Sequence, residues 1–231
     1  MARGDRKKPE LISGKIGDRI GIVIGGKQYY KSLYSPTNPR TPEQQKHRAK
    51  LAFVNRLSAQ LAEAVNRGFA MVPKPNSGVS PRNAFVKTNW NNGSLVWDEE
   101  EGAWHLCPKK LVVANGPLFI DRNMSAMVEN GVLYITCPNS GMGESYASED
   151  DRMTIAIFGQ TATTPGIYIG PLRREIDGRI VCLPPDGCQF GSDDPLHVYV
   201  WFKATLYQRA EGGHWTVTTG QSSPSLYLGA F

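Results

Sequence analysis

The stretch that decides the fold is SPTNPRTPEQQKHRAKLAFVNRLSAQLAEAVNRG, which runs from Ser35 to Gly68. Its opening prolines, Pro36 and Pro39, favour an extended or turn conformation, because a residue before proline avoids the helical region. Apolar residues then recur at helical spacing, and they are Val54, Leu57, Leu61, Ala64 and Val65. The pattern predicts one long helix with a C-cap at Gly68, since glycine adopts a positive φ at low cost.

Three residues specify the start of this helix. Thr41 is a natural N-cap, and Pro42 suits the first helical position, where its missing N–H costs nothing. Gln44 stands three residues after Thr41, so the two can form a capping box. We therefore predict that Thr41, Pro42 and Gln44 cap the helix.

The first half of the predicted helix is strongly basic. Its cationic side chains are Lys46, Arg48, Lys50 and Arg56, with Arg40 directly before the helix and His47 among them. Cations near a helix N-terminus oppose the macrodipole, so this placement indicates that they meet something acidic in the fold or on a partner. The alternative interpretation is a solvated basic face.

Charge is divided unevenly along the whole chain. Residues 1–75 hold 15 Lys and Arg against 5 Asp and Glu, whereas residues 76–231 hold 11 against 16. A basic N-terminal third on an acidic body is typical of a region that binds phosphate, an acidic neighbour or the acidic part of a sister subunit.

The N-terminal part of the chain, residues 1–110, falls into two regions. Residues 1–12 carry charge and proline without periodicity, so we expect a flexible basic arm. A second region, residues 13–110, opens with a hairpin whose strands, Gly14–Ile24 and Lys27–Tyr34, flank the turn signal Gly25-Gly26. Its candidate partner contacts are Lys27, Lys31, Tyr29 and Tyr30, although such tyrosines also serve as packing residues.

Short strand candidates separated by turn signals recur from residue 111 to residue 231. They are Met127–Val128, Val132–Thr136, Met153–Phe158, Gly166–Ile169, Arg179–Cys182, His197–Thr205, His214–Thr218 and Ser225–Leu228. Before them, Ser94–Trp97 and Trp104–Leu106 predict a hairpin, and Lys110–Ala114 predicts a buried strand. We expect a mainly β protein with one long helix, in which the hairpin-plus-helix region precedes an immunoglobulin-like or fibronectin type III-like β-sandwich.

The sequence contains no recognisable catalytic pattern. His47, His105, His197 and His214 are scattered, and no nucleophile-elbow or zinc-protease motif occurs. The acidic runs Asp98–Glu101 and Glu149–Asp151 lie in turn-like stretches, which we interpret as solvated. The four cysteines, Cys107, Cys137, Cys182 and Cys188, form no C-x-x-C pair. We therefore predict a protein that is not an enzyme and has no metal and no cofactor.

The sequence also bears on location. No apolar run approaches the roughly 18 residues that span a bilayer. The N-terminal residues MARGDRKKPELISG lack the apolar core of a secretion signal. The expected location is the cytoplasm, or a virion or similar particle after assembly.

Several stretches, in order along nearly the whole chain, carry a family likeness. They are the helix start Asn38-Pro39-Arg40-Thr41 with Gln44 or Gln45, Arg48, Lys50 and Leu51, then Pro108–Leu118, Asn139–Gly143, His197–Phe202 and Ser225–Phe231. The chain resembles an uncharacterised bacterial domain family with a glycine-rich hairpin, an N-P-R-T-x-x-Q-x-x-x-R-x-K-[FL] helix and a fibronectin type III-like module. The helix motif is also similar to phage virion proteins. The resemblance implies a fold and brings no catalytic residue, and the chain departs from it at Asp98–Gly102 and Glu211–His214.

These observations favour a non-enzymatic structural or assembly protein of a phage or phage-like particle. Its basic N-terminal region would dock on protein subunits, either copies of itself or other particle components. One alternative is a nucleic-acid-binding protein whose phosphate contacts are Arg40, Lys46, Arg48, Lys50 and Arg56. Another is a carbohydrate- or protein-binding sandwich that uses exposed tryptophans such as Trp104.

Overall fold

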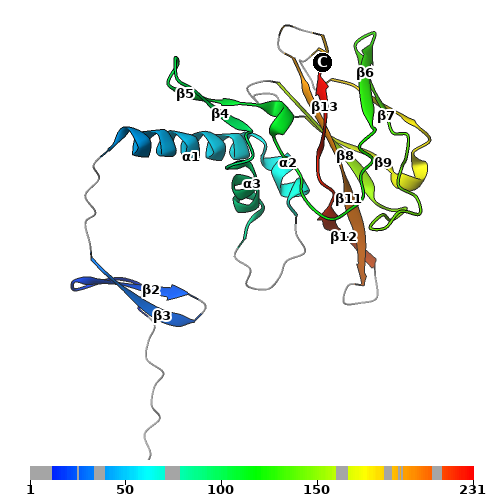
Figure 1. Ribbon diagram of the computed structural model, residues 1–231. Helices are drawn as coiled ribbons and strands as arrows, with labels where there is room; N and C mark the ends of the chain where they lie inside the picture. The colour runs from blue at the N-terminus through cyan, green and yellow to red at the C-terminus, as the bar shows by residue number, and fades with distance from the viewer. Residues whose placement is uncertain are drawn as a thin grey trace, which may run out of the picture. The chain divides into compact units, whose positions relative to one another are not determined.

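The computed structural model describes residues 12–24, 26–33, 40–70, 79–159, 166–184, 189–191, 193, 195–209 and 215–231, with the backbone alone for 205–209 and 215–219. The chain divides into two compact units, Met1–Gln44 and Gln45–Phe231. Strands outnumber helices among the described elements, so the fold is mainly β (Figure 1). The predicted arm before Ile12, the predicted turns at Gly25 and at residues 34–39, Cys188 and His214 lie outside the described residues.

The N-terminal unit contains a three-stranded antiparallel sheet. Its strands in order are β1 (Gly14–Ile16), β2 (Arg19–Ile24) and β3 (Lys27–Ser32). The sequence predicted one strand from Gly14 to Ile24, and this is wrong, because a turn at Gly17-Asp18 separates β1 from β2. Gly17 has a φ of 58°, a value that glycine adopts without steric cost.

Three α-helices are described, where the sequence predicted one long helix. They are α1 (Pro42–Gln60), α2 (Ala62–Gly68) and α3 (Pro81–Asn89). Leu61, with φ −93° and ψ 25°, separates α1 from α2, although its N–H still donates to Leu57 O at 2.9 Å and its carbonyl still accepts from Val65 N–H. The interruption is therefore a local change of backbone direction that keeps the helical hydrogen bonds.

The strands of the second unit form three antiparallel sheets. One is a hairpin of β4 (Leu95–Asp98) and β5 (Ala103–Leu106). The second, the small sheet, has the order β10-β7-β6 and consists of β6 (Ser125–Glu129), β7 (Val132–Thr136) and β10 (Arg179–Cys182). The third, the large sheet, has the order β12-β11-β8-β9, and β13 also pairs with β11. Its strands are β8 (Arg152–Phe158), β9 (Gly166–Leu172), β11 (His197–Arg209), β12 (Trp215–Ser222) and β13 (Leu226–Ala230).

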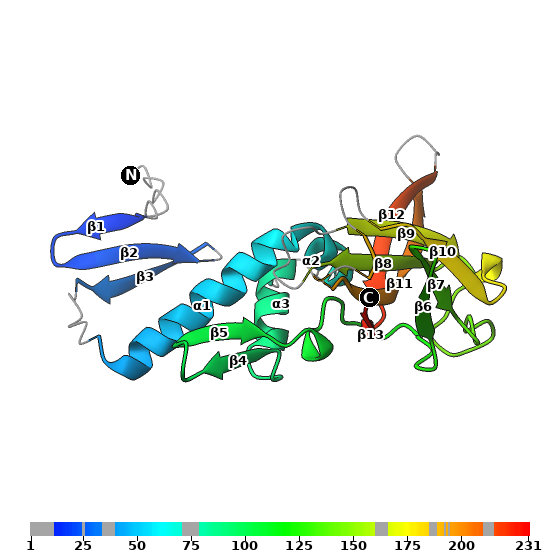
Figure 2. The ribbon, with the colours of Figure 1, turned by 90° about the horizontal axis from the view of Figure 1, so that it is seen from above.

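Strand β11 lies at the centre of this unit because both of its faces are buried. Val198, Val200 and Phe202 point into a core shared with the small sheet. Tyr199 and Trp201 point the opposite way, into a core shared with α1, α2 and α3. The large sheet is therefore a middle layer, with helices on one face and the small sheet on the other (Figures 1 and 2). The period of two along β11 confirms the predicted alternation, whereas the helical layer was not predicted.

The eight strand candidates of the C-terminal region all overlap described strands, although Ser225 precedes β13 and His214 lies outside the described residues. Lys110–Ala114 does not form a strand. Instead, a 3-10 turn at Pro108–Lys110 leads into irregular, buried chain. Side chains form hydrogen bonds with the backbone of this buried stretch. The Asn89 amide bonds both the N–H and the carbonyl of Val112, and Ser225 Oγ accepts from Val113 N–H at 3.1 Å. The apolar composition of Lys110–Ala114 therefore predicted its burial correctly, but the predicted strand is wrong.

Candidate interaction surfaces

One face of the N-terminal sheet combines exposed apolar side chains with lysines. In the register of the sheet, Ile22 lies opposite Tyr29, and the two outer rungs pair isoleucines with lysines. Directly paired residues share a face of an antiparallel sheet. We call this surface the N-terminal face, and it consists of Ile20, Ile22, Ile24 and Tyr29 together with Lys15, Lys27 and Lys31. Ile24 is 63% exposed and Tyr29 is 48% exposed.

The opposite face of this sheet is crossed by the chain that precedes β1. The Gln28 side chain accepts a hydrogen bond from Ile12 N–H and donates one to Ile12 O, both at 2.8 Å. Gly21 makes the crossing possible, because a Cβ atom there would lie 2.5 Å from Ile12 O. The predicted contact Tyr30 lies on this second face, apart from Tyr29.

The N-terminal unit has almost no core of its own. Among its described residues only Gly21 is buried. A small sheet requires an apolar face packed on something else for independent stability. The N-terminal face therefore has the composition of a surface that packs against something else.

The basic helix face predicted from the sequence is largely engaged within the chain. Lys46 Nζ lies 3.1 Å from Glu99 Oε1 and 4.6 Å from the ring centre of Trp97. Lys50 Nζ lies 4.8 Å from the ring centre of Trp90 and 4.7 Å from that of Trp104. Cations over indole rings are stabilised electrostatically by the ring quadrupole. Partial burial lowers the pKa of Lys50.

Trp104 acts as a packing residue in this cluster. It meets Trp97 edge-to-face across the β4–β5 hairpin, with ring centres 5.4 Å apart. Its Nε1–H donates to Lys46 O at 3.1 Å, and the side chain is half-buried. The predicted aromatic contact therefore fastens the hairpin to α1, which occupies its N–H and one ring face.

The remaining predicted cations lie in different places. Arg40 precedes α1 with a φ of 49°, and Arg48 is exposed on α1. Arg56 lines a groove of about 300 Å³ beside β5, together with Phe53, Leu57 and Gln60 of α1 and with Trp104, His105 and Leu106. The helix start agrees with the predicted cap, since Gln44 N–H donates to Thr41 Oγ1 at 3.4 Å and Pro42 is the first helical residue.

Three titratable groups, two exposed and one half-buried, gather at the tip of the β4–β5 hairpin. Ligand atoms of Asp98, Glu101 and His105 lie within 4.8 Å of one another. Asp98 also accepts the backbone N–H groups of Glu101 at 3.0 Å and Glu100 at 2.8 Å, and these bonds hold its pKa below the usual range. The carboxylate closes the acidic turn predicted from the sequence.

An apolar groove opens between the large and small sheets at their free edges. Strand β9 ends the large sheet and β10 ends the small one, and the groove of about 410 Å³ lies between them. Three of its lining side chains are more than half exposed, namely Ile169, Val181 and Leu183. We call it the β9–β10 groove, and no motif in the sequence indicated it.

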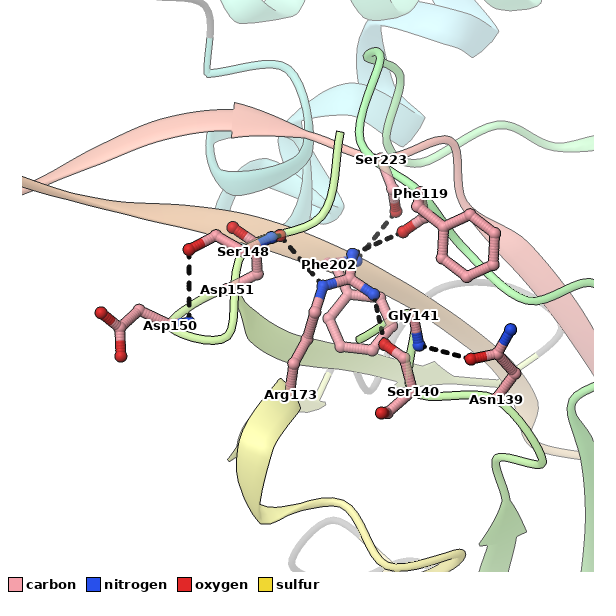
Figure 3. A network of polar contacts seen from close by, with 10 residues as sticks. All are labelled: Phe119, Asn139, Ser140, Gly141, Ser148, Asp150, Asp151, Arg173, Phe202 and Ser223. Carbon is pink, nitrogen blue, oxygen red and sulfur yellow. Dashed lines mark hydrogen bonds and ion pairs between the residues drawn. The ribbon is translucent and has the colours of Figure 1, made fainter. Parts of the chain in front are cut away.

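A buried ion pair at one end of the large sheet was also missed. Arg173 is fully buried, and Asp151, interpreted from the sequence as solvated, is 1% exposed. Arg173 Nε donates to Asp151 Oδ2 at 3.0 Å, and its other nitrogens donate to Ser140 O and Phe119 O. Figure 3 shows the guanidinium held among these groups beside the Phe202 ring, whose centre lies 3.7 Å away.

Lys203 of β11 is a second buried cation, 7% exposed. Burial, with a smaller contribution from Arg67, lowers the pKa of Lys203 to about 8. The unfolded chain, with a lysine pKa near 10.5, binds more protons than the folded chain between pH 8 and 10.5. The free energy of unfolding therefore rises with pH through that window, as Lys203 loses its charge. Below pH 8 the full destabilising effect of the buried charge is present.

Replacement of Lys203 by methionine is expected to raise the free energy of unfolding at pH 7 by on the order of 2 kcal/mol, because the apolar side chain carries no charge to desolvate. The advantage of the variant over the native chain should shrink as pH rises from 8 to 10.5. Urea unfolding followed by tryptophan fluorescence measures both, with exposed Lys87→Met as the control. A variant that is less stable than the native chain at pH 7 but not at pH 10.5 would show instead that the Lys203 ammonium stabilises the fold.

No family model, curated protein or solved structure matches this chain. No helix among the described residues is long and apolar enough to cross a membrane.

Proposed function

We propose that this protein is a non-enzymatic assembly component of a phage or phage-like particle, which docks on a protein subunit through the N-terminal face. The observation that carries the proposal is the pairing of exposed Ile22, Ile24 and Tyr29 with Lys15, Lys27 and Lys31 on a unit with almost no core. The second unit, with its two C-terminal sheets, would be the rigid scaffold, of immunoglobulin-like or fibronectin type III-like kind.

The character of the N-terminal face favours a protein partner over nucleic acid. Nucleic-acid surfaces bind phosphates with cations and stack bases on aromatic rings. Isoleucine side chains make neither contact, and they occupy the middle of this face. Lys46 and Lys50, which the nucleic-acid alternative needs, already contact Trp97, Trp90 and Trp104 of the same chain. A protein surface that is apolar with an acidic rim would contact both the apolar side chains and the lysines of the N-terminal face.

The test is cofractionation of the tagged full-length chain with high-mass particles from its source on a density gradient, before and after nuclease treatment. We expect the native chain in the particle fractions and Ile24→Ser at least about tenfold depleted there, because loss of an interface anchor costs more than 1 kcal/mol. Leu51→Ser, an exposed leucine on α1, is the matched control and should behave as the native chain does.

Two outcomes would contradict the proposal. One is a native chain that remains in the low-mass fractions throughout. The other is a particle association that nuclease removes and that Lys27→Gln with Lys31→Gln abolishes while Ile24→Ser leaves it intact. That second pattern, with an affinity for DNA or RNA that falls steeply with salt, would identify nucleic acid as the ligand.

A further inference from the structure

We propose that the β9–β10 groove is the receptor for the N-terminal face of a second copy of this chain, so that copies join head to tail. This inference rests on the proposed function and adds the identity of the partner. Its two halves are both present in the chain: an uncovered apolar face on the N-terminal unit and an uncovered apolar groove on the other unit.

The groove is suited to apolar side chains carried by a sheet. Its floor includes Ile155 and Ile180, and its rim exposes Ile169, Val181 and Leu183 at 53%, 59% and 62%. Its volume of about 410 Å³ lies within the range of ligand pockets in proteins, roughly 300–1,000 Å³. Exposed aliphatic groups gathered at one place mark an interaction site more often than scattered ones do. Ile22, Ile24 and Tyr29 supply apolar groups for such a groove.

Charge beside the groove complements the lysines of the N-terminal face. The chain between β9 and β10 contains two arginines, and a third begins β10. Each pairs with an acid: Arg173 with Asp151, Arg174 with Asp150, and Arg179 with Glu129. Glu175 and Asp177 of the same segment remain exposed as carboxylates. The neighbouring Arg152 donates to Gly170 O at 3.4 Å and keeps its positive charge, so the two carboxylates leave a small acidic excess beside it. Lys15, Lys27 and Lys31 would meet this excess at the rim of the interface.

The free edges around the groove favour the same occupant. Among the described strands, β9 pairs with β8 alone and β10 pairs with β7 alone. Exposed sheet edges offer unpaired backbone groups to an incoming strand, and β1 and β3 are the edges of the N-terminal sheet. Because the face and the groove are different surfaces, their contact is heterologous and repeats into a ring or a filament.

Sedimentation velocity of the full-length chain over a concentration series tests the inference. The native chain should form species larger than a dimer, and Ile24→Ser and Val181→Lys should each weaken association at least about tenfold. Mixing the two variants is the decisive step. Ile24→Ser keeps an intact groove and Val181→Lys keeps an intact face, so the mixture should form one-to-one dimers and nothing larger. Thermal unfolding should show both variants folded, since both positions are more than half exposed.

Val96→Lys places the same cation at an exposed valine of β4, and Leu51→Ser removes an exposed leucine of α1, and both should associate as the native chain does. A native chain that stays monomeric at all concentrations overturns self-association, while the particle experiment still decides the proposed function. Loss of association in Ile24→Ser but not in Val181→Lys overturns the groove as receptor and leaves the N-terminal face as the docking surface.

Discussion

Replacement of Arg173 by methionine is expected to lower the free energy of unfolding by about 3–5 kcal/mol, because removing one partner of a buried ion pair leaves the other charge uncompensated. The side chain is fully buried and pairs with Asp151, which is 1% exposed. Its loss would also leave Ser140 O without a donor that now lies 2.6 Å away and Phe119 O without one at 2.5 Å. Methionine fills part of the volume and replaces none of these bonds.

A double-mutant cycle separates the ion pair from the other contacts. Asp151→Asn removes the carboxylate charge, and combined with Arg173→Met it should restore part of the stability that Arg173→Met alone removes. Arg174→Met is the matched control, because Arg174 is the adjacent residue and its pair with Asp150 is partly exposed, with side-chain exposures of 47% and 29%. The control should change the free energy of unfolding by less than about 1 kcal/mol. Equal losses from Arg173→Met and Arg174→Met in urea unfolding would contradict the assignment.

The position of Arg173 connects this network to the groove. It lies in the 3-10 turn Arg173–Glu175 that follows β9, and the chain then enters β10 at Arg179. The guanidinium fastens this turn to the loops that carry Phe119 and Ser140. Rigid edges lose less conformational entropy when a partner binds than loose edges do. The ion pair therefore stabilises the fold and also holds the connection between the two strands that border the groove.

Periodicity predicted the strands well because it reflects burial directly. Val132–Thr136 and Arg179–Cys182 match β7 and β10 residue for residue, and the alternation from His197 to Lys203 follows the two faces of β11. His197 lies on the same strand, where it is buried and its Nδ1 lies 3.0 Å from the Tyr227 hydroxyl oxygen. The alternation of side chains comes from the geometry of the strand and does not depend on which element packs against it. The local sequence is therefore enough to predict it.

The candidate site was harder to predict because its contacts join residues far apart in the sequence. The unfavourable cations at the start of α1 correctly suggested a compensating group. Nothing local showed that Lys50 would meet Trp90 and Trp104, or that Glu99 would reach Lys46. The acidic run that ends at Asp151 looked like solvated loop, since the sequence gives no sign of Arg173, 22 residues later, as its partner. The β9–β10 groove depends on which strands become edges, and that is decided by the whole topology.

Gly68→Ala is expected to lower the free energy of unfolding by about 3 kcal/mol, because a side chain inserted into close-packed surroundings forces neighbours apart. The sequence suggested a C-cap at Gly68 that uses a positive φ. The structure gives it another role as the buried last residue of α2, packed against residues 113 and 114. A Cβ atom at Gly68 would lie 2.1 Å from Val113 O and 2.7 Å from Ala114 Cβ. Both neighbours are fully buried, so neither can move aside cheaply.

The sign of this effect is a sharp test, because helix propensity alone favours alanine over glycine by about 1 kcal/mol. Gly170→Ala is the matched control: its Cβ would meet Met153 Cβ at 3.4 Å, an ordinary contact, on the edge strand β9. We expect the control to change stability by less than about 1 kcal/mol, since surface substitutions away from special contacts are nearly neutral. Urea unfolding of both variants measures the difference. A Gly68→Ala variant as stable as the native chain would mean that α2 and the chain at Val113 and Ala114 lie farther apart than this packing requires.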